Sequence, residues 1–250
     1  MKTLSFDTSG PVVTVALMEN ADIVASKSVP PNQSGRQEAV SQLMPTIDAL
    51  TSQKKWTRDS IDLIVVGIGP GSFTGMRTSV VTARTLAQSL KIALVGIDSL
   101  KCYAASLPLP AMVVLSGGRG HYFVGSYTSG VEGKNRWQPG DPPLNCVLEP
   151  CCLMRDDFVL ALSKTENCFV EDKILDEVTA LKSTAAPIPE GLNIAEMQAL
   201  LAASELNLIN KNREGLKNTY TFDSVNPLYL RGASITMKPT QANDQTGSRN

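Results

Sequence analysis

The chain has 250 residues, of which 42% are hydrophobic and 19% charged, and its formal net charge is −1. A disordered chain needs lower hydrophobicity and a higher net charge, so this composition excludes that class. A net charge this close to zero disfavours a stand-alone nucleic-acid binder, because it gives no long-range attraction to a polyanion. No apolar run reaches the about 18 residues of a membrane span. We expect no secretory signal, since Asp7 interrupts the N-terminal apolar segment.

The cysteine and histidine counts limit the chemistry of the chain. Its five cysteines are odd in number and none stands in a Cys-x-x-Cys spacing, so we interpret them as reduced thiols of a cytoplasmic protein. The single histidine, His121, cannot complete a two-histidine metal site, so we expect no metal. We expect His121 to be a strand residue rather than a catalytic base, because no nucleophile or orienting partner is visible.

The first 107 residues predict one α/β domain. The polar turn Asp7–Gly10 separates two strands, and a third strand is expected over residues 23–29. Apolar residues at helical spacing predict a helix over residues 35–53, with a kink or a broken start at Pro45. Buried strands are expected over residues 62–68 and 92–97. A glycine-rich turn and a helix separate these two strands, so we expect them to be parallel, with a right-handed crossover.

Residues 108–237 predict a second domain, because Pro108 and Pro110 interrupt the chain after a short helix over residues 99–107. Its elements are expected in this order: strands over 111–114 and 121–128, a loop or a decorated hairpin over 129–145, short elements over 147–180, a helix over 194–210 and a short strand over 225–230. Residues 238–250 carry no apolar anchor and predict a disordered tail.

One glycine-rich segment is the least generic part of the sequence. It comprises Gly67, Ile68, Gly69, Pro70, Gly71, Ser72, Phe73, Thr74, Gly75, Met76 and Arg77. One explanation is a tight strand-to-helix turn, with a positive φ at a glycine such as Gly71 and a cap from Ser72 or Thr74. A Walker A loop needs a lysine where Met76 stands, and a dinucleotide turn or a nucleophile elbow needs another glycine spacing.

The string GIGPGSFTGMR, together with FDTS at residues 6–9 and QLMPTIDAL at residues 42–50, resembles the TsaB family, formerly called YeaZ. This family acts in bacterial synthesis of the tRNA modification threonylcarbamoyladenosine (t6A). The resemblance covers about residues 1–125 and resumes at PLYLR, residues 227–231. It implies an actin-like α/β fold of the sugar-kinase and heat-shock-protein superfamily, with two related subdomains of mixed sheets and a cleft between them.

The resemblance also implies a place for a nucleotide. In catalytic relatives, an aspartate at the first strand-turn-strand unit approaches the phosphates. The matching residues here are Asp7, Thr8, Ser9 and Gly10. Two departures weaken this assignment. Gly117, Gly118 and Arg119 replace an Asp-Ala-Arg phrase of the family, and Arg36, Gln37 and Glu38 stand where the catalytic subunit carries its metal histidines. We therefore expect no cofactor, with ATP binding left open.

The function implied is that of a non-catalytic subunit. It would support a TsaD-type enzyme that transfers threonylcarbamoyl to adenosine 37 of tRNA, with a TsaE-type ATPase as a further partner, a homodimer when alone, and tRNA contact only through the complex. The alternative is an actin-fold small-molecule kinase or nucleotide-binding protein. A peptidase is disfavoured, because no nucleophile, base and orienting group are visible together.

The resemblance implies that the partner docks on the helices of the first domain. We expect the apolar stripes of these helices to stay partly exposed in the monomer. The alternative is that they pack on their own sheet. The candidate interface residues are Val40, Leu43, Met44, Ile47, Leu50, Met76, Val80, Ala83 and Ala87.

Overall fold

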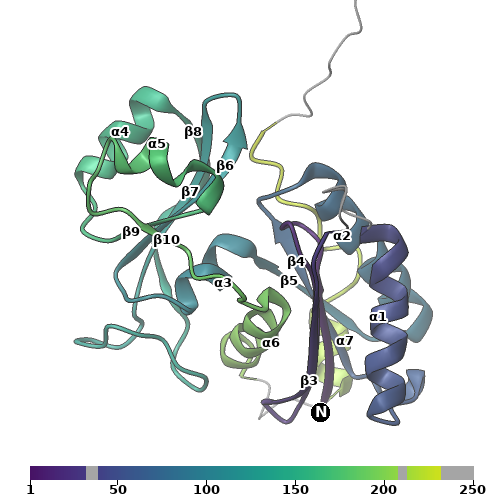
Figure 1. The fold of residues 1–250 in the computed structure, drawn as a ribbon. Helices are drawn as coiled ribbons and strands as arrows, with labels where there is room; N and C mark the ends of the chain where they lie inside the picture. The colour runs from purple at the N-terminus through teal and green to yellow at the C-terminus, as the bar shows by residue number, and fades with distance from the viewer. Residues whose placement is uncertain (32–38, 208–212, 232–250) are drawn as a thin grey trace, which may run out of the picture.

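The computed structural model describes residues 1–31, 39–207 and 213–231, which form two lobes around two five-stranded sheets (Figure 1). The strand orders are β3-β2-β1-β4-β5 and β10-β9-β6-β7-β8. Both sheets contain parallel and antiparallel pairs, as expected from the sequence. The predicted disordered tail, residues 238–250, lies outside the described residues. None of the described helices combines the length and the hydropathy that a membrane-spanning helix requires.

The first sheet has the predicted order of elements. It contains β1 (Lys2–Asp7), β2 (Val13–Glu19), β3 (Asp22–Val29), β4 (Leu63–Gly69) and β5 (Ala93–Asp98). The first three strands pair antiparallel, and β4 pairs parallel with both β1 and β5. The helices that follow β3 and β4 are α1 (Ala39–Gln53) and α2 (Phe73–Leu90), with a 3₁₀ turn at Arg58–Ser60. Helix α1 continues through Pro45 without a break.

The two faces of the first sheet differ in chemistry. Leu4 and Phe6 of β1 pack into an apolar cluster with α1 and α2. The alternate residues Thr3, Ser5 and Asp7 are also buried, but on the face that α6 (Ile194–Glu205) covers. Side chains alternate across a strand, so one strand supplies both an apolar and a polar layer. The polar layer ends at the turn that the sequence marks as a candidate site.

The second sheet follows the short helix α3 (Ser99–Ala105). Its elements are β6 (Ala111–Gly118), β7 (His121–Thr128), β8 (Asn145–Met154), α4 (Arg155–Ser163), β9 (Cys168–Val170), a 3₁₀ turn (Asp172–Ile174), α5 (Leu175–Thr179) and β10 (Ala186–Pro187). Strands β6, β7 and β8 pair antiparallel, whereas β9 pairs parallel with β6 and β10. The predicted short helix and first strands of this half are confirmed.

The C-terminal part of the chain returns to the first sheet. Helix α6 contacts β1, β2 and β4, and α7 (Arg213–Thr219) contacts β5. The sequence analysis assigns both helices to the second domain, but in the structure they contact the first sheet. The domain boundary after residue 107 stays a prediction. Helix α6 ends at Glu205 rather than residue 210, since Asn207 has a left-handed φ of 48°.

The predicted strand over residues 225–230 is wrong, because this segment is irregular. Pro227 has no backbone N–H to donate and cannot continue a sheet ladder. The amide of Leu228 still donates to the carbonyl of Ile68 at the end of β4, at 2.8 Å. The segment is therefore bound to the end of the first sheet without forming a strand.

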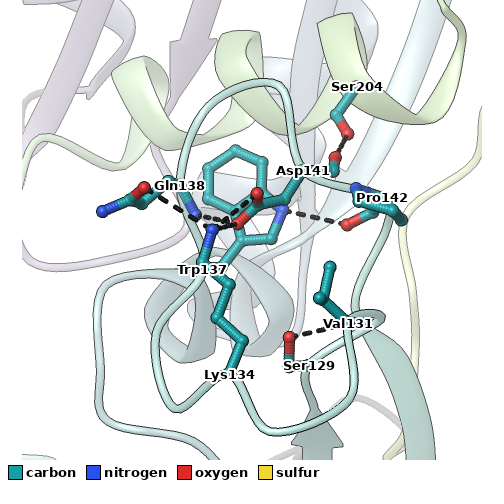
Figure 2. Close-up of polar contacts among 8 residues, drawn as sticks. All are labelled: Ser129, Val131, Lys134, Trp137, Gln138, Asp141, Pro142 and Ser204. Carbon is teal, nitrogen blue, oxygen red and sulfur yellow. Dashed lines mark hydrogen bonds and ion pairs between the residues drawn. The ribbon is translucent and has the colours of Figure 1, made fainter.

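Residues 129–144 form a long loop between the antiparallel strands β7 and β8, within the segment predicted as a loop or a decorated hairpin, and the loop is held by its own contacts (Figure 2). Lys134 Nζ lies 2.7 Å from both carboxylate oxygens of Asp141. The indole of Trp137 is 5% exposed and donates to the carbonyl of Pro142 at 3.2 Å. Ser204 of α6 donates to the carbonyl of Asp141. The loop is thus tied to α6 and contributes Trp137 to the apolar cluster that includes residues of both sheets.

Candidate functional site

The glycine-rich motif packs directly on the turn that follows β1. The amide of Ser72 donates to the carbonyl of Ser9 at 2.7 Å, and the hydroxyl of Thr8 donates to the carbonyl of Gly75 at 2.6 Å. A Cβ on Gly71 would overlap the carbonyl of Ser9, and a Cβ on Gly75 would overlap the carbonyl of Thr8. The two motifs quoted for the resemblance therefore form one unit, in which glycines allow backbone to contact backbone.

The turn is close to the predicted strand-to-helix turn, with one correction. Gly69, rather than Gly71, has the positive φ, at 93°. Gly71 is required by its closeness to Ser9 and not by its own backbone conformation. Ser72 is the N-cap of α2, and its hydroxyl accepts a hydrogen bond from the amide of Gly75 at 3.2 Å. Thr74, the other candidate cap, lies inside the helix.

The carboxylate of Asp7 is buried, with the residue 2% exposed, and both of its oxygens accept hydrogen bonds. Oδ1 accepts from the amide and the hydroxyl of Ser9, at 2.5 and 2.7 Å. Oδ2 accepts from the side-chain amide of Gln198 on α6 at 2.7 Å, and more weakly from the hydroxyl of Ser99 at 3.4 Å. A Cβ on Gly67 would overlap this carboxylate. The carboxylate of Asp7 is thus enclosed by the protein's own groups.

A cluster of aromatic rings and one cation lies at the start of α2. The guanidinium of Arg77 lies 4.4 Å from the ring centroid of Phe73. The ring of Tyr229 lies 5.1 Å from that of Phe73, and its hydroxyl accepts from Arg77 Nε at 3.0 Å. The structure therefore joins the two separated stretches of the resemblance, GPGSFTGMR and PLYLR.

A cleft of about 1070 Å³ separates the two lobes. Asp7, Ser9 and Gly10 line it from the turn after β1, and the motif contributes residues 70–73 and Met76. The end of β6 lines the opposite wall with residues 115–118. The cleft implied by the resemblance is therefore present, and the candidate motif residues lie at one side of it.

Sequence reasoning missed several polar residues of the cleft. Glu171 follows β9, and its carboxylate accepts a hydrogen bond from the amide of Ser116 at 2.8 Å. Lys173 and Arg231 line the same cleft, as does Tyr103 of α3, whose phenol has a pKa that burial raises. A signal for Glu171 was available in the sequence, since it follows an apolar run and carboxyl ends of parallel strands meet at one edge of a sheet.

Most of the candidate interface residues are buried in the monomer. The expectation of a partly exposed stripe is wrong for Leu43, Ile47, Leu50, Met76, Val80, Ala83 and Ala87, all of which are buried. Six of them belong to the apolar cluster under the first sheet, because each helix turns its one apolar face toward the strands. Met44 is 45% exposed, and Val81, which was not among the candidates, is 62% exposed. The side chain of Val40 lies outside the described part of the structure.

The described residues offer no evident metal chemistry. Within the described ranges, no three His, Cys, Asp or Glu side chains lie close enough together to hold a metal ion. His121 begins β7, as expected, and its Nδ1 lies 3.0 Å from the carbonyl of Arg119. Arg36, Gln37 and Glu38 lie outside the described residues.

An ionisable group lies at the junction of the lobes. Asp98 caps α3 by accepting from the amide of Lys101 at 2.8 Å, and it accepts from the hydroxyl of Tyr127 on β7 at 3.1 Å. Burial raises the pKa of the Asp98 carboxyl to about 6. Lys101 forms an ion pair with Glu205 at the end of α6. Elements from both halves thus meet around one titrating carboxyl.

Comparison with known proteins agrees with this geometry. A model of the family described as "TsaD: tRNA N6-adenosine threonylcarbamoyltransferase" matches residues 21–136. The chain is 33% identical over 108 residues to the tRNA threonylcarbamoyladenosine biosynthesis protein TsaB of Bacillus subtilis, a match that covers 42% of this chain and 44% of that protein. Over less than half of its length, the chain is therefore similar to proteins of the TsaB/YeaZ family.

A further relative and a solved structure are also similar to this chain. TsaB of Escherichia coli is 26% identical over 104 residues, which is 42% of this chain and 43% of that protein. YeaZ from Pseudomonas aeruginosa has a similar solved structure, with a TM-score of 0.69, 18% identity, and coverage of 92% of this chain and 99% of that one. The expected actin-like α/β fold is confirmed. The chain spans 60% or less of the length of the curated relatives that it matches.

Proposed function

We propose that this chain is a non-catalytic subunit in the synthesis of t6A, and that it supports a TsaD-type enzyme that transfers threonylcarbamoyl to adenosine 37 of tRNA. The t6A role is supported by the family, whose curated relatives are named for that biosynthesis. The non-catalytic part rests on one observation, the enclosed carboxylate of Asp7.

A magnesium nucleotide is the ligand that an actin-like ATPase fold implies. Its metal needs carboxylate oxygens that can accept a further ligand, or bind water that does. Both oxygens of Asp7 are occupied by Ser9, Gln198 and Ser99. The residues of this chain do not fit such a group in the described arrangement. We therefore assign no reaction step to the cleft and no cofactor to the subunit.

The small-molecule kinase remains the alternative. A kinase needs an acid that acts as general base or holds the metal at the second lobe. Gly117 and Gly118 occupy the position of the family's acid, while Glu171 nearby accepts the amide of Ser116. The cleft is also lined by the carboxylates of Asp172 and Glu190. The arrangement favours the subunit, because the carboxylates of Asp7 and Glu171 both accept hydrogen bonds from the protein's own donors.

The proposed docking surface is the outer face of α1 and α2. Their inner faces are core, so a partner would contact the exposed side chains around Met44 and Val81. An apolar residue on this face loses water when a partner covers it, which stabilises the complex. We propose the TsaD-type enzyme as this partner, with a second copy of the chain competing for the same face. A TsaE-type ATPase and tRNA would join only through the complex.

A binding experiment with the TsaD-type enzyme from the same source tests the proposal. The full-length chain and the enzyme would be mixed at micromolar concentration and analysed by size-exclusion chromatography with light scattering. We expect a stoichiometric complex, and no tight binding of magnesium ATP by the isolated chain in calorimetry. A failure to bind the enzyme, together with tight nucleotide binding, would favour the kinase alternative.

A further inference from the structure

The last described segment of the chain, residues 220–231, passes from the first lobe to the second. It begins at the first sheet, where the amide of Leu94 donates to the carbonyl of Tyr220 at 3.2 Å. Val225 is buried in the apolar cluster of that lobe, and Arg84 of α2 donates to the side chain of Asn226 at 3.2 Å. Figure 1 shows the segment, in yellow, running toward the end of β6.

The middle of the segment contacts the glycine-rich motif, residues 67–77. Leu228 donates its amide to Ile68, the residue before Gly69 at the end of β4. Tyr229 then covers Phe73, and its hydroxyl accepts from Arg77. The guanidinium lies over Phe73 at 4.4 Å and 6.0 Å from the centroid of Tyr229, so it contacts both rings. This is an anchor on the first lobe, made by side chains that are not part of the core.

The end of the segment binds the second lobe. Arg231 Nη1 donates to the carbonyls of Gly117 and Gly118, at 2.8 and 2.7 Å. These carbonyls stand at the end of β6, where Gly118, Arg119 and Gly120 all have a left-handed φ. Hydrogen bonds from a guanidinium are stronger than those between neutral groups. Arg231 is therefore an anchor on the second lobe, two residues away from the anchor on the first.

The two anchors lie at the cleft, because residues 228–231 line it. The lobes also meet elsewhere. One apolar cluster contains Val65 and Ile97 of the first sheet together with Val113 and Tyr127 of the second, and α3 and α6 contribute to it. That junction is buried and close-packed, whereas Tyr229 is 44% exposed. Partly exposed polar contacts open more readily than a buried apolar junction.

We propose that residues 226–231 are a latch that fixes how far the cleft between the two lobes is open. Tyr229 holds the latch to the first lobe and Arg231 holds it to the second. Release of either anchor leaves the buried junction around α3 and α6 as the remaining connection, and the lobes then open about it. The proposal is independent of the t6A function, because it rests only on contacts within this chain.

A distance measurement across the cleft tests the latch. Spin labels would be introduced through a non-canonical amino acid at Thr74 of the first lobe and Asp172 of the second, both exposed, and distances measured by pulsed electron resonance. Arg231→Met removes the guanidinium but keeps an apolar stem. Tyr229→Ala removes the ring and hydroxyl contacts of the first-lobe anchor with Phe73 and Arg77. We expect each variant to shift the mean distance outward by more than the width of the wild-type distribution.

Matched controls separate the latch from a general loss of stability. Arg155→Met removes an arginine whose ion pair, with Glu177, lies within the second lobe, and it should leave the distance unchanged. Tyr229→Phe removes only the hydroxyl and should give a smaller shift than Tyr229→Ala. Circular dichroism checks that each variant is folded. The distance distribution of either anchor variant is a separate test of the latch. A distribution for either Arg231→Met or Tyr229→Ala that superimposes on the wild type would overturn the proposal.

Discussion

The carbonyl oxygen of Thr8 lies where the Cβ of any residue other than glycine at position 75 would have to stand. The same pair is joined by the hydrogen bond from the Thr8 hydroxyl to the Gly75 carbonyl, at 2.6 Å. The first turn of the chain and the first turn of α2 are therefore in backbone contact. This relationship explains in physical terms why the FDTS and GPGSFTG strings occur together.

Replacing Gly75 should be costly. We expect Gly75→Ala to lower the free energy of unfolding by about 2 kcal/mol or more, since an added methylene in a tightly packed place forces the backbone apart. Urea denaturation followed by circular dichroism measures this. Gly10→Ala in the same turn is the control, because its Cβ would meet only the hydroxyl of Tyr103, at an ordinary 3.7 Å. Equal stability of the two variants would show that the close contact is not needed.

The enclosure of Asp7 depends on Gln198. We expect Gln198→Leu to destabilise the protein by about 1.5–3 kcal/mol, because Oδ2 of the buried Asp7 carboxylate loses its shortest hydrogen bond. A hydrogen bond to a charged group contributes about this much to stability. Gln88→Leu on the exposed face of α2 is the control and should change stability by less than about 0.5 kcal/mol. A thermal or urea unfolding series measures both. A Gln198→Leu protein as stable as the control would contradict the network.

The raised pKa of Asp98 predicts a dependence of stability on pH. A carboxyl whose pKa is about 6 in the folded protein, above the ordinary 3.8, stabilises the fold at low pH and loses this contribution as pH rises through 6. From pH 5 to pH 7, wild type should therefore lose on the order of 1 kcal/mol relative to Asp98→Asn. Asparagine still caps a helix, which makes the variant a fair comparison.

Urea denaturation of both proteins at several pH values between 4 and 8 measures this difference. The difference in the free energy of unfolding between wild type and Asp98→Asn should be constant below pH 4 and should change toward pH 7, as wild type loses stability. Parallel curves across the whole range would show that Asp98 titrates normally in the folded protein.

The burial of the helix stripes reverses one expectation from the sequence. Ile47→Glu and Val80→Glu should unfold the isolated chain, since each places a carboxylate in the apolar cluster. Met44→Glu and Val81→Glu should melt near the wild-type temperature and lose binding to the TsaD-type enzyme. Gln53→Glu, at the exposed C-terminal end of α1, is the control for added charge. Calorimetric titration measures the binding, and unimpaired binding by both exposed variants would move the docking surface elsewhere.

Much of the architecture was predictable because it follows local patterns. The polar turn between β1 and β2, the apolar runs of β4 and β5, and the helical spacing of α2 each predicted an element that is present. The exposed fraction of Ile47 was not predictable in this way. A helix shows the same period whether its apolar face meets a sheet or a partner, so periodicity alone cannot separate core from interface.

The site was predictable in part. The glycine motif identified the turn, but the contact of Gly71 with Ser9 depends on two segments more than 60 residues apart in the sequence. Gln198 carries no local signal, because an amide in an apolar helix is recognised only once its carboxylate partner is placed opposite. The strand prediction for residues 225–230 failed because it followed the apolar residues of the segment, although Pro227 cannot donate to a sheet ladder. The amide of Leu228 instead donates to the carbonyl of Ile68 at the end of β4.

The central claim is most directly tested by reconstituting t6A synthesis. The TsaD-type enzyme and TsaE-type ATPase from the same source would be incubated with unmodified tRNA and a threonylcarbamoyl donor, with and without this chain, and t6A measured by mass spectrometry of the nucleosides. We predict that t6A forms only when the chain is present, and that the chain without the TsaD-type enzyme forms none. Full t6A synthesis in the absence of the chain, or synthesis by the chain alone, would contradict the account.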